Sequence, residues 1–96
     1  MINLAVRGDL GDVVARAGAG VKWTNAFAGL PPSEFPMLFA LTPYGDAMFN
    51  QRQMPLLLAE LDRLPAACSG EWVAQARELC QVVEHGTHLY LWFIGD

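Results

Sequence analysis

The sequence contains few basic residues, and they do not cluster. Six lysines and arginines stand singly against ten acidic residues, which gives a formal net charge of −4. Binding to nucleic acid requires a basic stripe or patch that neutralises phosphates, so this composition argues against a nucleic-acid ligand. The acidic balance favours a basic partner, although mild acidity is also common in proteins that have none.

Long apolar runs and cysteines are also scarce. The charge-free stretches, such as residues 35–45 and 86–95, are well short of the ~20 residues that a membrane-spanning helix needs. The N-terminus lacks the basic and apolar regions of a signal peptide. Cys68 and Cys80 are the only cysteines and do not form a disulfide framework. We therefore expect a reduced, cytoplasmic protein that does not cross a membrane.

The usual signatures of catalytic and cofactor sites are missing. His85 and His88 have a gap that some metal ligands use, but a zinc site needs three or four converging ligands. Residues 18–22, Gly-Ala-Gly-Val-Lys, do not match a phosphate-binding loop, and neither serine lies in a GxSxG motif. We expect no metal, no cofactor and no catalytic nucleophile.

Apolar residues are plentiful, at 53% of the chain, and their spacing predicts two amphipathic helices. The first repeats leucines from Met54 to Leu64, with Pro55 in its first turn, its polar side at Glu60, Asp62 and Arg63, and its end before Pro65. The second begins after Ser69 as the N-cap. It carries an apolar stripe from Trp72 to Val83 and ends at Gly86.

The remaining apolar runs predict strands and one short helix. Leu89–Ile94 is apolar on both alternating faces, so it is either an interior strand or a strand whose outer face is an interface. Met37–Thr42, between two prolines, and Ile2–Val6 are further strand candidates. Residues Leu10–Ala17 have helical spacing and predict a two-turn helix.

Together these elements predict one α+β domain over residues 1–96. Residues 1–36 form an irregular part with a short strand and helix, and residues 37–96 run strand, helix, helix, strand. We expect a small sheet of about three strands with the two amphipathic helices packed on one face. The second face of the last strand must then be covered by the coil around Trp23 and Phe27, by a second copy, or by another protein.

Polar side chains gather where the chain leaves the turn at residues 43–46 and enters the next helix. They could form a small-molecule site, also a hydrolytic one, at one end of the sheet. Alternatively, Asp46 and Asn50 hydrogen-bond to backbone N–H groups of the turn and the helix start. The candidate ligand- or partner-binding residues are Tyr44, Asp46, Asn50, Arg52, His88, Trp92 and Asp96.

Two segments carry a resemblance to other proteins. Residues 43–53 read PYGDAMFNQRQ and residues 88–96 read HLYLWFIGD. This combination resembles a group of small bacterial proteins that share a PYGDxxFNxxQ-like element and an HLYLxFIGD-like ending. The resemblance covers about a fifth of the chain. It implies a shared fold and adds no mechanism.

The composition and the missing motifs favour a non-enzymatic protein-interaction module. An immunity-type inhibitor or an accessory subunit that binds a basic protein would be of this kind. The alternatives are a small-molecule-binding or hydrolytic protein with its site at residues 44–52, and a domain that forms a homodimer through its sheet.

Overall fold

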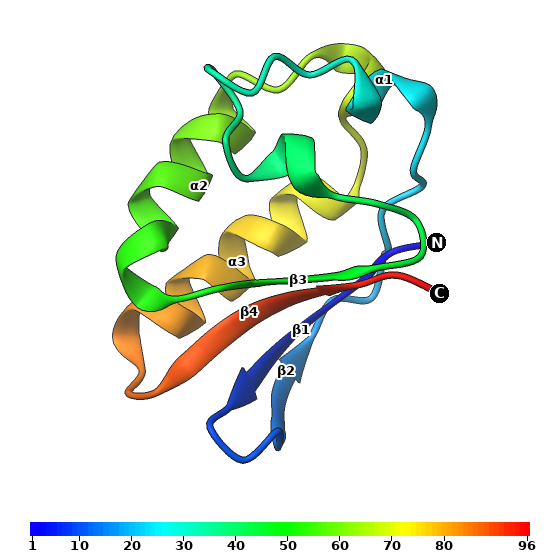
Figure 1. Ribbon diagram of the computed structural model, residues 1–96. Coiled ribbons are helices and arrows are strands. Elements are labelled where there is room, and N and C mark those ends of the chain that lie inside the picture. Colours follow the sequence, from blue (N-terminus) through cyan, green and yellow to red (C-terminus); the bar gives the residue numbers. More distant parts are fainter.

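The computed structural model describes all 96 residues and has an α+β fold, as predicted (Figure 1). An antiparallel sheet of four strands, one more than expected, has the order β2-β1-β4-β3. The longer helices pack on one of its faces. The strands are β1 (Asn3–Gly8), β2 (Val13–Arg16), β3 (Asp46–Phe49) and β4 (Leu89–Ile94).

Strands β1 and β4 form the centre of the sheet. They pair from Asn3 with Ile94 to Gly8 with Leu89, so the N-terminal and C-terminal ends of the chain lie side by side. Leu4, Val6 and Phe93 point toward the helices and are buried. The strand predicted over Leu89–Ile94 and the short N-terminal strand are therefore confirmed.

The helix predicted over Leu10–Ala17 is wrong, because this segment contains β2. Gly11 adopts a φ of 83°, which glycine accepts without strain, and the chain turns back so that Ala15 pairs with Val6. Leu10 is 96% exposed, so it does not contribute to a buried helical stripe. The helical spacing arose by coincidence in a short hairpin, where pairing with β1 determines the conformation.

The strand predicted over Met37–Thr42 is also wrong. Residues Leu38–Ala40 form a 3₁₀ turn, and the missing strand is β3, a few residues later. The backbone N–H groups of Met37 and Leu38 donate to the carboxylate of Glu60, at 3.3 and 3.0 Å, instead of to a strand. Met37, Leu38 and Leu41 of this segment fill the core without joining the sheet, whereas Phe39 is exposed.

Helices α2 (Met54–Asp62) and α3 (Trp72–His85) cover one face of the sheet (Figure 1). Pro55 lies in the first turn of α2 and the helix ends before Pro65, as predicted. Ser69 does not cap α3, because the 3₁₀ turn Ala66–Cys68 ends at Ser69 and α3 begins three residues later. The predicted coil also contains the short helix α1 (Asn25–Ala28). No helix has both the length and the apolar character to cross a membrane.

The core lies between the helices and the inner face of the sheet. Phe93 makes edge-to-face contacts with Phe49 and Trp72, with ring centroids 5.7 and 6.4 Å apart. Trp23 packs against this core and donates its indole N–H to the carbonyl of Leu41. Both cysteines are buried as free thiols. Burial, and then the charge of Glu84, raises the pKa of Cys80 to about 12, which keeps this thiol protonated and unreactive.

The two segments that carry the family resemblance are neighbours in the sheet. Strand β3 pairs with β4 from Asp46 with Ile94 to Phe49 with Leu91. Beyond this pair, the N–H of Gly95 donates to the carbonyl of Gly45 at 3.1 Å. Residues 43–53 and 88–96 therefore form one structural unit of the sheet.

Replacing Gly95 with alanine is expected to destabilise this unit by about 2 kcal/mol, because the new methyl group overlaps backbone atoms. A Cβ at Gly95 would lie 2.6 Å from the carbonyl oxygen of Gly45. Gly18→Ala is the control, since its Cβ would meet nothing closer than 3.6 Å. Urea unfolding of both variants tests the contact, and equal stability of the two would contradict it.

Candidate functional site

The structure divides six of the seven predicted site residues between the two ends of β3, and the seventh, Trp92, lies between them beside Met48. Tyr44, Asp46 and Asp96 lie at the end where the two chain termini meet, and Asn50, Arg52 and His88 lie at the other end. Asp46 and Asn50 are separated by about 13 Å of extended chain. The predicted cluster at one end of the sheet is therefore not assembled as one site.

The residues at the terminal end have few partners. Tyr44 and Asp46 are exposed, and the turn beside them is held by the hydroxyl of Thr42, which accepts a hydrogen bond from Gly45 N–H. The carboxylate of Asp96 lies 3.2 Å from the amino group of Met1. Both of these groups are mostly exposed, so the pair contributes little to stability.

At the opposite end, a shallow depression of about 250 Å³ brings three predicted residues together. Its lining residues are Asn50, Gln51, Arg52, His88, Leu89 and Tyr90. Two of these side chains already serve the fold. Asn50 and Gln53 form a capping box at the start of the helical segment, and the amide of Gln51 donates to the carbonyls of Glu84 and Gly86 at the end of α3.

Asn50→Ala is expected to cost about 1 kcal/mol of stability, since the backbone N–H of Gln53 loses its acceptor. Asn50→Asp retains an acceptor at this position and should be close to wild type. Thermal unfolding measures both variants. A loss of stability in Asn50→Ala identifies Asn50 as a helix cap. Unchanged stability would contradict the capping role and favour a role of Asn50 in ligand binding.

Asp9, which the sequence patterns did not single out, joins this end of the sheet. Its carboxylate lies 3.5 Å from Nδ1 of His88. A hydrogen bond to Asp9 and the charge of its carboxylate raise the pKa of Tyr90. His88 has a φ of 56°, an uncommon conformation for this residue that places it at the start of β4. The side chains of Asp9 and His88 are at least half exposed, so the contact between them contributes little to stability.

The face of the sheet opposite α2 and α3 is the larger unexplained surface, and we refer to it as the open face. The coil around Trp23 does not cover it, because Trp23 packs against the core. Met48 and Val14, near its two sides, are 50% and 52% exposed. The register places on this face Asn3, Ala5 and Arg7 of β1, Val13 and Arg16 of β2, Asp46 and Met48 of β3, and Tyr90, Trp92 and Ile94 of β4. Val14, next to Val13, lies at the register shift between β1 and β2.

Trp92 occupies the centre of the open face. It is the direct neighbour of Ala5 in β1, and Ala5 is only 2% exposed although it lies on this face, because the larger side chains around it shield it. The guanidinium of Arg7 lies 5.0 Å from the centre of the Trp92 ring, within cation–π range. Nε of Arg7 is buried and has no hydrogen-bond partner.

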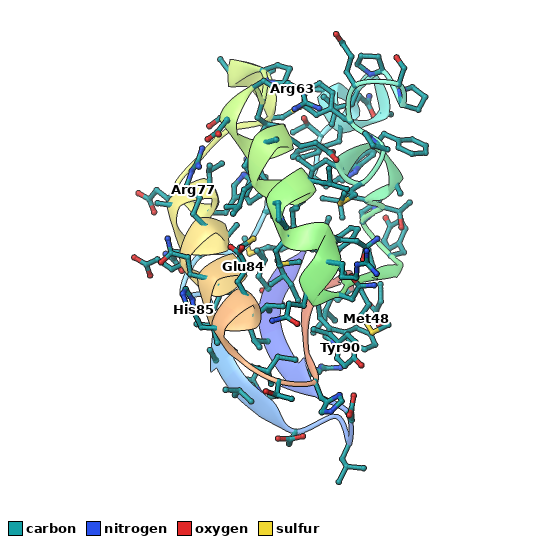
Figure 2. All side chains as sticks on the ribbon, turned by 90° about the vertical axis from the view of Figure 1, so that its left-hand side faces the viewer. Met48, Arg63, Arg77, Glu84, His85 and Tyr90 are labelled. Carbon is teal, nitrogen blue, oxygen red and sulfur yellow. The ribbon has the colours of Figure 1, made fainter.

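Carboxylates mark both ends of the open face. Asp9 and Asp12 belong to the turn between β1 and β2, and Asp46 and Asp96 lie at the opposite end (Figure 1). Met48 and Tyr90 lie on the side of the molecule away from Arg77 and His85 of α3 (Figure 2). The surface therefore combines an aromatic and aliphatic centre, two arginines, and acidic groups at its ends.

No group of three His, Cys, Asp or Glu side chains lies close enough together to hold a metal ion. No known protein family, curated protein or solved structure matches this chain.

Proposed function

We propose that this chain is a non-enzymatic protein-interaction module that binds a basic partner protein through the open face of its sheet. The observation that carries the proposal is that Met48, Trp92 and Val13 remain on a sheet face that no helix of the chain covers. An antiparallel sheet can expose one face to water, but such a face is then usually polar. A partly exposed aromatic and aliphatic face fits a docking surface better.

Two electrostatic features support a protein partner. The buried Nε of Arg7 has no acceptor, and a backbone carbonyl or a polar side chain of a docked protein could supply one. The acidic groups at both ends of the face, together with the net charge of −4, favour a partner that carries basic residues around an apolar centre. An immunity-type inhibitor or an accessory subunit would act in this way.

Met48→Asp places a charge on the open face and is expected to weaken partner binding at least about tenfold, since the interface would bury an unpaired carboxylate. Leu56→Asp, on the exposed side of α2, is the matched control and should bind like wild type. Affinity capture from native extract followed by titration of the captured protein measures both. Binding to a basic partner should also weaken as salt rises.

Two results would contradict this proposal. One is a wild-type chain that is monomeric in gel filtration and captures no specific partner. The other is equal binding by Met48→Asp and Leu56→Asp when circular dichroism shows that both variants are folded.

The depression beside β4 favours a second candidate, a small-molecule site that uses Arg52 and His88. A guanidinium and an imidazole beside the apolar Leu89 could hold a small carboxylate or phosphate compound. A ligand of this kind should raise the melting temperature of wild type but not of Arg52→Ala. A compound library that stabilises neither protein would remove this candidate.

A further inference from the structure

The positive and negative charges of the open face are separated from one another. Arg7 lies in one row of the sheet, beside Tyr90 of β4. Arg16 lies in the neighbouring row, beside Ala5 of β1. The carboxylates described above lie at the two ends of the face instead. The open face is therefore positive at its centre and acidic at its ends.

The guanidinium of Arg7 is held at this centre without a counter-ion. It lies 5.0 Å from the centre of the Trp92 ring, and the side chain is half-buried. The chain has ten acidic residues, yet none of them forms an ion pair with Arg7. Its buried Nε also has no hydrogen-bond partner. Charged groups that lose contact with water are normally paired, so Arg7 lacks the anion that such a position usually contains.

The position of Arg7 suits a carboxylate that arrives from outside. Contact with the Trp92 ring restricts the side chain, so less conformational entropy is lost when its outer N–H groups bind an anion. The planar fork of N–H groups matches a carboxylate, which can accept two parallel hydrogen bonds. Arg16 also has no ion pair and adds a second positive charge in the neighbouring row.

We propose that the partner inserts one carboxylate side chain, of aspartate or glutamate, against Arg7 and directs basic residues toward the acidic ends of the open face. This inference rests on the proposed function and specifies the chemistry of the partner. The partner is then basic in net charge but has an acidic anchor in the middle of its binding surface. A uniformly basic surface would instead bring like charges against Arg7 and Arg16, which costs free energy and disfavours such a partner.

Short random peptides displayed on phage provide a probe for this chemistry. They are selected against the wild-type chain, and those that no longer bind Met48→Asp are retained as ligands of the open face. We expect the retained peptides to share one aspartate or glutamate flanked by lysine or arginine. Replacing that acidic residue with its amide should weaken binding to the wild-type chain about tenfold or more, as measured by fluorescence anisotropy.

A double-mutant cycle then assigns the peptide carboxylate to Arg7. In Arg7→Gln, the same change from acid to amide should have almost no effect, because the cation that it meets is gone. A merely structural role of Arg7 would not produce this coupling. Arg77→Gln, on α3 and away from Met48 (Figure 2), is the control for net charge and should respond like wild type. If Arg7→Gln does not fold, as judged by circular dichroism, Arg7→Lys replaces it and should retain only part of the coupling.

The outcomes separate this inference from the proposed function. Retained peptides without an acidic residue would overturn it and leave the open face as a docking surface. The same follows if the change from acid to amide weakens binding equally in wild type and in the Arg7 variant. A selection that yields no peptide sensitive to Met48→Asp would contradict docking at the open face, and the acidic anchor with it.

Discussion

Replacing Glu60 with alanine is expected to lower the free energy of unfolding by about 3 kcal/mol. Glu60 is 1% exposed, and its carboxylate accepts hydrogen bonds from the backbone N–H groups of Met37 and Leu38. Alanine leaves both buried donors without an acceptor and opens a cavity beside the 3₁₀ turn. Part of this loss is offset, because the alanine variant no longer has the free-energy cost of keeping a carboxylate out of water.

Glu60→Gln is the matched control for this prediction. Its amide has nearly the same shape and keeps one acceptor oxygen, so we expect a smaller loss, about half that of the alanine variant. Urea unfolding at unchanged slope gives both values. A Glu60→Ala protein within about 0.5 kcal/mol of wild type would show that residues 37–38 do not depend on this carboxylate.

The second large effect is expected at Phe93, on the inner face of β4. Phe93→Ala should cost about 3–5 kcal/mol, because the side chain is fully buried and contacts Phe49 and Trp72 edge to face. Trp92→Ala, one residue away on the open face, should cost about 1–2 kcal/mol through the lost contact with Arg7 and the lost cover of Ala5.

The comparison between these two neighbours tests whether the two faces of β4 differ. Denaturant unfolding of both variants, with the m-value monitored, gives the two free energies. A loss at Trp92 as large as that at Phe93 would mean that the open face is packed within the chain and is not available for docking.

The elements with strong periodicity could be predicted from the sequence, and those fixed by distant contacts could not. Strand β4 and helices α2 and α3 have apolar patterns long enough to indicate both type and place. Strand β2 has four residues, too few to distinguish a strand from a helix by spacing. Met37–Thr42 has strand-like composition, but a carboxylate 22 residues farther along the chain holds its backbone in a turn.

The predicted site depends on the position of the third strand. With a strand at residues 37–42, residues 43–53 read as one link between strand and helix, and their polar groups were expected to meet. Because β3 occupies Asp46–Phe49, it separates Asp46 from Asn50. The alternative, in which Asp46 and Asn50 bond to backbone N–H groups, holds for Asn50, whose side chain accepts from Gln53 N–H. In the turn, the hydroxyl of Thr42 takes the place expected for Asp46. The spacing predicts Glu60 on the solvent side of its helix, but Glu60 is buried, because a periodic pattern gives no sign of an acceptor for distant backbone groups.

The open face was only partly predictable. The doubly apolar pattern of β4 indicated that its second face needed a cover, but it could not show that Trp23 packs elsewhere. In β1, the small Ala5 and the basic Arg7 alternate with the buried Leu4 and Val6. This alternation is a weak indication that Ala5 and Arg7 lie on the opposite face of the strand. Their relation to Trp92 depends on the register between the two ends of the chain, which no local pattern contains.

The most direct test of the open face as the docking surface is hydroxyl-radical footprinting of the chain alone and in complex with its captured partner. Met48 and Trp92 are both oxidisable and lie on the open face, whereas Phe39 is exposed elsewhere. We predict strong protection of Met48 and Trp92 in the complex and unchanged oxidation of Phe39. Protection of Phe39, with Met48 and Trp92 as reactive as in the free chain, would contradict the proposal.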